Sequence, residues 1–309
     1  MDDLQTELKR RLAKVKQVFD VDKAVSVEAT LTSIARYYKI NKLAYSFFHN
    51  PRGFVHTGIS RDLKYKPNDL LEQPKLVARY IEQLNACNVL ELATGKGASS
   101  IYLAQKFPNV KFDGIDLPGG QLGVAEKAAR GVQNFSPVEG DFHDLSQYPD
   151  NHFDVVFVVE SLCHSTKKDK VASEVWRVLR DGGVFVIFDG YLGKFGDSLN
   201  ANECLAKKLV ERGMMVNNFE NYDAVKGRIL LTGFKVIYEE DVSTFIMPTL
   251  RRFERVAKRA VFNHPRFGRF IVKLLPDEFT FNAISGFLML LLVKLGVARY
   301  MILVIEKQG

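Results

Sequence analysis

The chain has 309 residues, of which 47% are hydrophobic and 26% are charged, and its formal net charge is +7. This composition is typical of a globular chain with a large core, which argues against a disordered or fibrous protein. The length fits two average domains, or one α/β domain with additions. The three cysteines form no C-x-x-C pair, which indicates reduced thiols in a cytoplasmic setting and no zinc site. The first twenty residues are charged throughout and do not resemble a signal peptide.

A charged helix is predicted over residues 2–19. Leu4, Leu8, Leu12, Val15 and Phe19 recur at helical spacing, so they would share one face of it. We expect this helix to pack against the rest of the chain or to form a dimer contact.

An aromatic segment follows the first helix. It contains the pair Tyr37 and Tyr38, a further aromatic run that includes Tyr45, and the tripeptide His-Thr-Gly that begins at His56. One interpretation is that these rings close over a ligand. The simpler one is that they form core in front of the next domain.

From Leu70 onward, predicted strands and helices alternate. Strands separated by helices of this length indicate an α/β fold with a doubly wound parallel sheet. The predicted strands are 88–93, 110–117, 135–140, 153–160, 183–190, 233–238 and 300–305. The predicted helices among them are 74–85, 98–106, 120–131, 167–180 and 200–212.

A glycine turn follows the first of these strands. Gly95 and Gly97 let the backbone bend sharply and approach a bound molecule. Asp116 ends the next strand, nineteen residues after Gly97, where a carboxylate can accept both ribose hydroxyls of a nucleoside. A dinucleotide fingerprint would want a third glycine where this chain has Ser100.

The stretch from Glu91 to Gly97 resembles the first motif of the class I, Rossmann-like S-adenosylmethionine-dependent methyltransferases. Ala93 stands where that motif usually has its first glycine. The later motifs follow in order and the resemblance spans roughly residues 85–195. It implies S-adenosylmethionine as the cofactor and a seven-stranded sheet whose last strand is antiparallel. The residues it assigns to the cofactor are Tyr38, Glu91, Ala93, Thr94, Gly95, Gly97, Asp116, Leu117, Gln121, Asp141, Phe142 and Glu160.

The sequence Glu-Ser-Leu-Cys-His at 160–164 resembles the Glu-Ala-x-Cys-His stretch of sterol methyltransferases. The Asp/Asn-Pro-Pro-Tyr motif of enzymes that methylate nucleic-acid bases is absent here. The Tyr-Tyr pair with His-x-Gly is similar to the N-terminal cap of sterol and tocopherol methyltransferases. These resemblances imply an apolar acceptor near Tyr37, Tyr45, His56 and Tyr191.

The resemblance also implies two catalytic residues. Glu160 would stabilise positive charge near the sulfonium or a carbocation, and His164 would take the proton that restores an alkene. Two simpler interpretations stay open: Glu160 only holds the methionine part of the cofactor, and His164 begins a helix without any chemical role. No histidine spacing suggests metal ligation.

The last two predicted strands form a hairpin in the resembled fold, but here 61 residues lie between them, 55 of which are residues 244–298. Between residues 244 and 298 there are nine basic and three acidic residues. Apolar residues of 250–261 share a helix face. The same helical spacing of apolar residues recurs in Phe267, Phe270, Ile271, Leu274 and Leu275. Residues 279–293 are uncharged but end at Lys294, short of the ~20 apolar residues of a membrane span.

These patterns predict a helical lid inserted between strands six and seven. Its apolar side would cover the substrate pocket, and its basic side would face water, anionic lipid or a phosphorylated substrate. The simpler alternative is the solvated face of ordinary amphipathic helices. The expected segments are a cap (1–72), a Rossmann-like domain (73–243), the lid (244–298) and the last strand (299–309).

The leading functional hypothesis is a methyltransferase for a small apolar acceptor such as a sterol, isoprenoid, prenylated quinol or lipid, with C-methylation as one form. The alternatives are N-, O- or S-methylation of a polar metabolite and a nucleic-acid-binding methyltransferase. No known nucleic-acid module is recognisable, so no nucleic-acid partner is expected. We expect a cytoplasmic protein with peripheral membrane contact through the basic lid, and the oligomeric state stays open.

Overall fold

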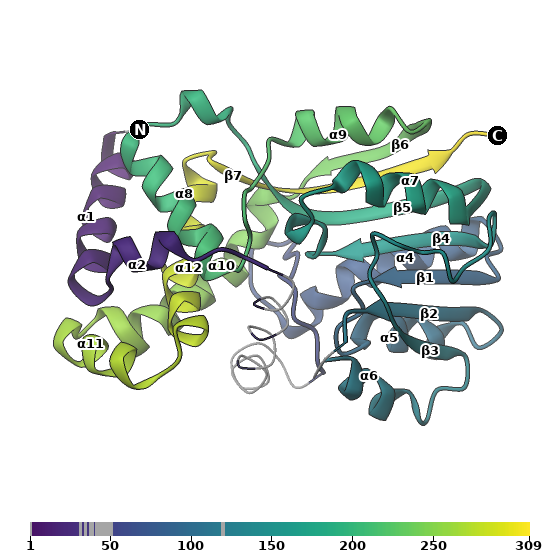
Figure 1. The fold of residues 1–309 in the computed structure, drawn as a ribbon, viewed down its shortest axis with the longest axis horizontal. Helices are drawn as coiled ribbons and strands as arrows, with labels where there is room; N and C mark the ends of the chain where they lie inside the picture. The colour runs from purple at the N-terminus through teal and green to yellow at the C-terminus, as the bar shows by residue number, and fades with distance from the viewer. Residues whose placement is uncertain (1, 31–32, 34–35, 37–39, 41–51, 119–120) are drawn as a thin grey trace.

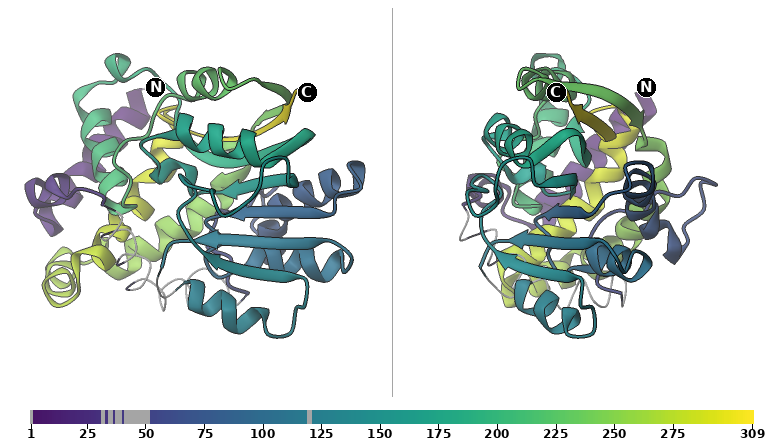
Figure 2. Two further views of the ribbon diagram at one scale, coloured as in Figure 1. Left: turned by 45° about the vertical axis from the view of Figure 1, so that its right-hand side comes forward. Right: turned by 90° about the vertical axis from the view of Figure 1, so that its right-hand side faces the viewer.

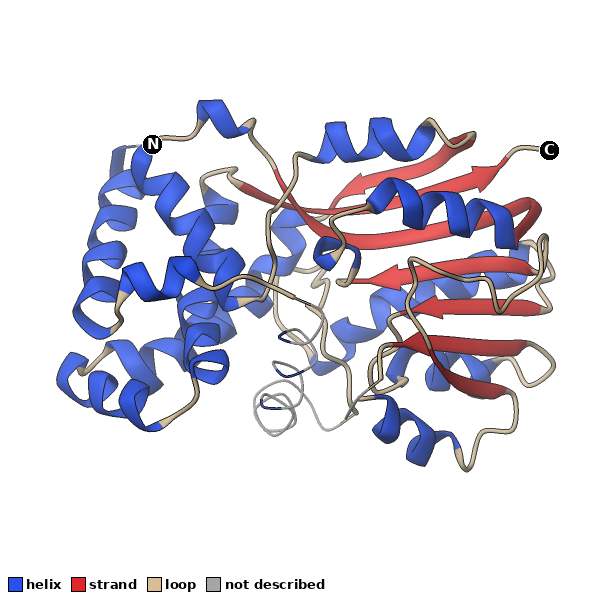
Figure 3. Ribbon diagram, viewed as in Figure 1, coloured by secondary structure: helices blue, strands red, loops and turns tan. Residues whose placement is uncertain are grey.

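The computed structural model describes residues 2–30, 33, 36, 40, 52–118 and 121–309. A seven-stranded sheet carries helices on both faces, and a group of helices lies beyond one end of it (Figures 1 and 3). The strands are β1 Asn88–Leu92, β2 Lys111–Asp116, β3 Phe135–Glu139, β4 Phe153–Val159, β5 Leu179–Leu192, β6 Phe234–Asp241 and β7 Ala298–Lys307.

The helices of the sheet region are α4 Glu72–Gln83, α5 Ala98–Lys106, α6 Leu122–Ala129, α7 Lys168–Val178 and α9 Tyr222–Leu230. Those of the helical region are α1 Asp2–Val18, α2 Val21–Ser26, α8 Ala201–Gly213, α10 Ser243–Ala257, α11 Pro265–Leu274 and α12 Asp277–Lys294. Shorter helical turns are η2 Pro67–Leu71, η3 Leu162–His164, η4 Gly196–Ser198 and the π-helical η5 Lys258–Phe262.

The strand order is β3-β2-β1-β4-β5-β7-β6, with β7 antiparallel to both of its neighbours. This confirms the predicted doubly wound sheet with an antiparallel last strand. The chain runs outward from β1 to β3 and then returns to add β4 on the other side of β1. Crevices that bind ligands form at such a reversal, beside the carboxyl ends of the strands.

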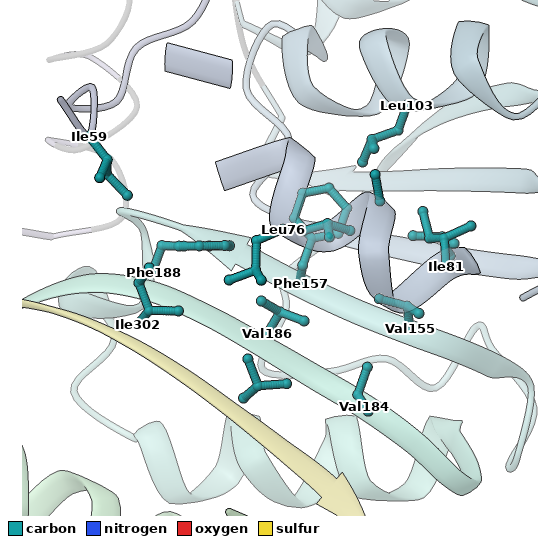
Figure 4. Packing of buried hydrophobic residues seen from close by; sticks show 14 of the residues in the cluster. Ile59, Leu76, Ile81, Leu103, Val155, Phe157, Val184, Val186, Phe188 and Ile302 are labelled. Atoms are coloured by element: carbon teal, nitrogen blue, oxygen red, sulfur yellow. The ribbon is translucent and has the colours of Figure 1, made fainter. Parts of the chain in front are cut away.

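The central strands of the sheet are buried on both faces. Val155 and Phe157 of β4 point towards α4 and α5, whereas Val156 and Val158 point to the opposite face, which α7 and α9 cover. Figure 4 shows Leu76 and Ile81 of α4 over Val155 and Phe157. A strand that is apolar on both sides reads as a continuous hydrophobic run, which explains the Val-Val-Phe-Val-Val pattern of β4.

The N-terminal helix α1 packs against α8, α11 and α12. Its Arg11 is 8% exposed, pairs with Glu254 of α10 and donates to the Phe287 carbonyl of α12 at 2.6 Å. A buried arginine needs such partners, because an unpaired buried charge is strongly destabilising. The Arg11 contacts therefore join the beginning of the chain to the segment between β6 and β7.

The segment between β6 and β7 is helical, as predicted, and consists of α10, η5, α11 and α12. The uncharged run forms most of α12, which is largely buried between α8 and α10. Among the described residues, no helix combines the length and the apolar character that crossing a bilayer would require.

The prediction that the apolar side of 267–275 faces the pocket is wrong for most of that helix. Phe267, Phe270, Leu274 and Leu275 are exposed, and only Ile271 lines the cavity described below. The reason is that the opposite side of α11, at Gly268, packs against Val261 and Val18. The division of the chain into four segments and the covering role of the insertion stay predictions.

Candidate active site

The turn after β1 has an unusual backbone. Ala93, Gly95 and Gly97 have φ values of +54°, +58° and +74°, all in the left-handed region. A Cβ on Gly97 would lie 2.9 Å from Cε1 of Phe135, whereas one on Gly95 would meet nothing within 4 Å. Gly97 is therefore required for packing, and Gly95 borders open space where a ligand can approach the backbone.

Glu91 braces this turn from within β1. Its Oε2 accepts hydrogen bonds from the Thr94 and Ser100 hydroxyls, both at 2.6 Å. Burial raises the pKa of Glu91 to about 7, although these hydrogen bonds oppose the shift. Ser100, which stands where a dinucleotide fold would have glycine, thus donates a hydrogen bond to the Glu91 carboxylate.

Asp116 ends β2 beside the same turn. Its carboxylate accepts hydrogen bonds from the Gly95 N–H and, at 2.8 Å, from the Leu117 N–H. The pKa of Asp116 is raised by burial, although the hydrogen bonds from the two N–H groups oppose this shift. The carboxylate is thereby oriented at the edge of the sheet where strand order reverses.

Glu160 follows β4 on the other side of β1. Its φ is +50°, a conformation that costs a non-glycine residue on the order of 1 kcal/mol or more. Its N–H donates to the Phe188 carbonyl at 2.8 Å, and its carboxylate accepts from the Thr57 N–H at 2.7 Å. Burial raises the pKa of Glu160 to about 7. Backbone strain of this kind concentrates at functional sites.

Asp189 of β5 is a buried carboxylate that the sequence interpretation missed. It accepts from the Cys163 N–H at 2.8 Å and the Gly190 N–H at 2.7 Å, and burial raises its pKa to about 6. A single acid at the end of the run Val-Phe-Val-Ile-Phe was the available signal. The negative charge of Asp189 also raises the pKa of Glu160.

His164 is the last residue of η3, which begins two residues after Glu160. Its Nδ1 is 2.9 Å from the Met215 carbonyl oxygen. Because a carbonyl only accepts, Nδ1 carries the proton, and the neutral ring keeps its lone pair on Nε2. Burial lowers the pKa of His164 to about 4, so the ring is neutral at physiological pH.

The loop after β3 brings Asp141, Phe142 and His143 to the same edge. His143 lies 2.6 Å from Asp141 through Nδ1 and 2.7 Å from the Ser165 hydroxyl through Nε2. Its ring is 4.7 Å from that of Phe142. Since Ser165 is only 2% exposed, we interpret this chain of contacts as a brace that orders the loop.

The carboxyl groups described above and His164 border one cavity of about 440 Å³. It begins at the carboxyl ends of β1, β2, β4 and β5 and continues between α10 and α12. The inner part is lined by apolar side chains, among them Leu250, Phe253, Val256, Ala283, Met289 and Val293.

The charged lining of the cavity is predominantly acidic. Five carboxylates border it, whereas the described cations along its wall are Lys96 and Arg299, and Arg299 pairs with Asp241 at 2.8 Å. The five carboxylates are Glu91, Asp116, Asp141, Glu160 and Asp189. A cationic or uncharged ligand suits this wall better than an anionic one.

Most predicted site residues border the cavity. They are His56, Glu91, Ala93, Thr94, Gly95, Asp116, Leu117, Gln121, Asp141, Phe142, Glu160, His164 and Tyr191. Gly97 serves packing behind the wall, and Tyr37, Tyr38 and Tyr45 lie outside the described residues.

Two predicted substrate contacts differ in what they can offer a ligand. Nε2 of His56 is already hydrogen-bonded to the Leu70 carbonyl oxygen at 2.9 Å, and burial lowers the pKa of His56 to about 4. The buried Tyr191 hydroxyl has no hydrogen-bond partner among the residues that the structure describes. A buried hydroxyl without a partner is costly unless a ligand or water satisfies it, so Tyr191 is the better candidate for a ligand contact. Within the described ranges, no group of three or more side chains is arranged to hold a metal ion.

Comparison with known proteins finds a family match within the sheet region. A family model described as a methyltransferase domain matches residues 90–187, which include the glycine turn, Asp116 and Glu160. The chain contains a class I S-adenosylmethionine-dependent methyltransferase domain.

The methyltransferase domain is similar to those of C-methylating enzymes. A sterol 24-C-methyltransferase of Neurospora crassa is 27% identical over 192 residues, 58% of this chain and 49% of that protein. The botryococcene C-methyltransferase of Botryococcus braunii is 26% identical over 185 residues, 59% of this chain and 48% of that protein. The chain spans about half the length of the curated relatives it matches.

Solved structures share the fold over nearly the whole chain. The cyclopropane synthase MmaA2 from Mycobacterium tuberculosis has a TM-score of 0.71 at 12% identity, covering 90% of this chain and 99% of that one. The cyclase SpnF has a TM-score of 0.69 at 19% identity, covering 91% and 97%. A fold shared by such different enzymes does not by itself specify the reaction, so function must be argued from the site.

The residues of the methyltransferase domain fit S-adenosylmethionine, the cofactor of this class. Asp116, Asp141 and Phe142 all border the cavity, where they would be available to the ribose and the adenine as predicted, and Gly95 leaves its Cβ direction open. Glu160 borders the cavity on the far side of β1, where a carboxylate suits a sulfonium. When bound, the cofactor supplies an electrophilic methyl group.

Proposed function

We propose that the chain transfers the methyl group of S-adenosylmethionine to a carbon atom of an apolar acceptor such as a sterol, isoprenoid, prenylated quinol or lipid. The observation that carries this proposal is the shape of the cavity, which passes from the cofactor residues into an apolar chamber between α10 and α12. The similarity to sterol and botryococcene C-methyltransferases supports it.

In the proposed reaction an alkene of the acceptor attacks the methyl carbon in line with the departing sulfur. A carbon–carbon bond forms, the methyl–sulfur bond breaks with its electron pair going to sulfur, and the acceptor becomes a carbocation. Loss of a neighbouring proton returns an electron pair to carbon and restores the alkene. Much of the acceleration of such a displacement comes from positioning and from exclusion of water, which an apolar chamber provides.

The roles of the chain's own residues follow from their geometry. Glu160 and Asp189 are the carboxylates that would stabilise the cationic acceptor, with the Thr57 N–H holding Glu160 in place. His164 presents a neutral Nε2 that can accept the proton, because its Nδ1 proton is bound to the Met215 carbonyl. A positioned base typically contributes about 10²- to 10⁴-fold to a rate.

The acidic lining also bears on the class of acceptor. A phosphorylated acceptor would face five carboxylates, and Arg299 is already engaged by Asp241. This favours an uncharged acceptor. The same carboxylates would suit a cationic amine, so N-methylation of a polar metabolite is the alternative that the experiment must separate.

The test is to incubate the protein with methyl-labelled S-adenosylmethionine and detergent-dispersed acceptors, comparing sterol, isoprenoid and prenylated quinol alkenes with polar amines and thiols. We expect label in the apolar products, with a new carbon–carbon bond seen by NMR. His164→Gln should retain affinity for S-adenosylhomocysteine and lose on the order of 100-fold or more in turnover. The matched control is His152→Gln, a histidine before β4 that does not border the cavity. Label found only in amines or thiols would refute the proposal.

A further inference from the structure

The outer face of α11 is an exposed apolar stripe. Phe267, Phe270 and Leu274 are 55%, 56% and 63% exposed, and their spacing of three and four residues places them on one side of the helix. Leu275, which follows the helix, is 39% exposed. Large apolar side chains gathered in this way mark an interaction surface rather than ordinary surface composition.

Packing on the opposite side of α11 fixes the direction of this stripe. A Cβ on Gly268 would lie 2.2 Å from the Val261 carbonyl oxygen and 3.3 Å from Cγ1 of Val18. The helix backbone is therefore pressed against η5 and α1 at Gly268. Rotating the phenylalanines inward would force another residue into that contact, so the stripe faces outward in the folded chain.

Basic residues flank the stripe. Arg266, Arg269 and Lys273 are exposed on α11, and none of them forms an ion pair with a residue that the structure describes. The nearest acids along the chain are engaged elsewhere, since Asp277 pairs with Lys23 at 2.6 Å and Glu278 with Arg36 at 2.7 Å. The outer face of α11 thus combines apolar side chains with uncompensated positive charge.

The position of α11 connects this face to the cavity. The helix lies at the periphery of the helical region, far from the sheet, in Figure 1 and in the left view of Figure 2. Ile271 borders the cavity while its neighbour Phe270 faces outward. One helix therefore has the apolar chamber on its inner side and the basic, apolar stripe on its outer side.

We propose that the outer face of α11 docks on an anionic lipid bilayer. Phe267, Phe270 and Leu274 enter the boundary between headgroups and acyl chains, and Arg266, Arg269 and Lys273 pair with lipid phosphates. Interfacial helices bind by this combination of apolar insertion and attraction to anionic lipid. A nucleic acid would use the cations but would leave the apolar stripe in water, so the stripe favours a bilayer.

Docking would place the chamber next to the phase in which an apolar acceptor dissolves. This consequence rests on the proposed function, whereas docking itself does not. The two ideas can fail separately. Vesicle binding without methylation of any apolar acceptor would remove the proposed function alone, and turnover in detergent without vesicle binding would remove the docking surface alone.

The experiment is co-sedimentation of the full chain with vesicles of phosphatidylcholine, and with vesicles in which about a third of the lipid is phosphatidylglycerol, a charged surface of the kind polybasic faces bind. We expect binding to the anionic vesicles only. The Phe267→Ser/Phe270→Ser variant should lose on the order of tenfold in partitioning. The Arg266→Gln/Arg269→Gln variant should lose roughly fivefold for each arginine.

The controls are Leu231→Ser, an 87% exposed leucine after α9, and Lys235→Gln, an exposed lysine of β6. Both should bind vesicles like the parent chain. Unchanged affinity for S-adenosylhomocysteine would show that the α11 variants are folded. The proposal is overturned if α11 variants and parent sediment alike. It is also overturned if the parent chain does not bind vesicles but binds RNA through the arginines, with an affinity that falls steeply as the salt concentration rises.

Discussion

The Thr57 N–H donates to Oε1 of Glu160 at 2.7 Å, and the Thr57 hydroxyl lies 3.3 Å from Oε2. Thr57 precedes η2, whereas Glu160 follows β4, so the segment before the sheet orients a carboxylate at its edge. Gln73 of α4 in turn donates to the Thr57 carbonyl at 2.6 Å. A residue outside the methyltransferase family match thus belongs to the site.

Glu160 should make binding of the sulfonium cofactor depend on pH. Its pKa of about 7 means that the carboxyl is protonated below that pH and ionised above it. A cationic sulfonium favours the ionised form, so affinity for S-adenosylmethionine should rise as the pH approaches about 7 and level off above it, while affinity for S-adenosylhomocysteine, whose sulfur is uncharged, stays nearly constant. Calorimetry with both ligands from pH 6 to pH 8.5 measures the ratio of the affinity for S-adenosylmethionine to that for S-adenosylhomocysteine. This range extends about one and a half pH units above the pKa of Glu160.

Glu160→Gln is the control for that titration. The variant should bind S-adenosylhomocysteine like the parent and lose the pH dependence of the ratio. If the dependence persists in the variant, Glu91 or Asp189, whose pKa values burial raises to about 7 and about 6, is responsible instead.

Asp116→Ala should weaken binding of S-adenosylhomocysteine by on the order of 10- to 100-fold, since a hydrogen bond to a charged group contributes about 1.5–3 kcal/mol. Asp113→Asn is the matched control, because Asp113 belongs to the same strand and does not border the cavity. Calorimetry that finds Asp116→Ala equal to the parent would contradict the assignment of Asp116 to the ribose.

Gly97→Ala should destabilise the chain by about 1–3 kcal/mol, because φ is +74° and the new Cβ would lie 2.9 Å from Phe135. Gly123→Ala is the control in α6, where a Cβ meets nothing within 4 Å, and helix propensity should make it neutral or stabilising by up to about 1 kcal/mol. Urea unfolding measures both. Equal effects of the two substitutions would show that the close approach at Gly97 is not important.

Ala283→Phe should fill part of the chamber without touching the cofactor residues. We expect turnover of a long apolar acceptor to fall on the order of tenfold or more, because overfilling a packed site displaces its occupant. Affinity for S-adenosylhomocysteine should change less than about twofold, since Ala283 borders the chamber from α12, whereas Asp116 borders the cavity from the end of β2. An unchanged rate with the longest acceptor would mean that the acceptor does not enter between α10 and α12.

Glu91→Gln should stabilise the ligand-free chain more at pH 8 than at pH 5. The folded pKa of about 7 lies above the ordinary value of 4.5, so the folded state holds the proton between these limits and stability falls as pH rises through them. Glutamine can still accept from Thr94 and Ser100. The gain over the parent should be on the order of 3 kcal/mol larger at pH 8, measured by urea unfolding at each pH. A gain independent of pH would contradict the raised pKa.

The strand pattern, the glycine turn and Asp116 could be predicted from the sequence because their causes are local. A buried parallel strand is a continuous apolar run, and a left-handed turn needs glycine within a few residues of it. Helix α9 was missed, although its N-cap Asn221 accepts from the Ala224 N–H at 3.2 Å. A helix of nine residues spans too few turns for a clear periodic signal, and β5 extends beyond the expected 183–190 through pairing with β7.

The sequence alone determined which residues form the sheet and the turn that borders the cavity, since periodicity and backbone sterics act over neighbouring residues. Only the tertiary structure decided that Thr57 orients Glu160, that Asp189 joins the same wall, and that the phenylalanines of α11 face outward. These relationships connect residues far apart in the chain. They depend on which side of a helix or strand is already occupied, as Gly268 shows for α11, and amphipathic spacing cannot indicate which neighbour will occupy it.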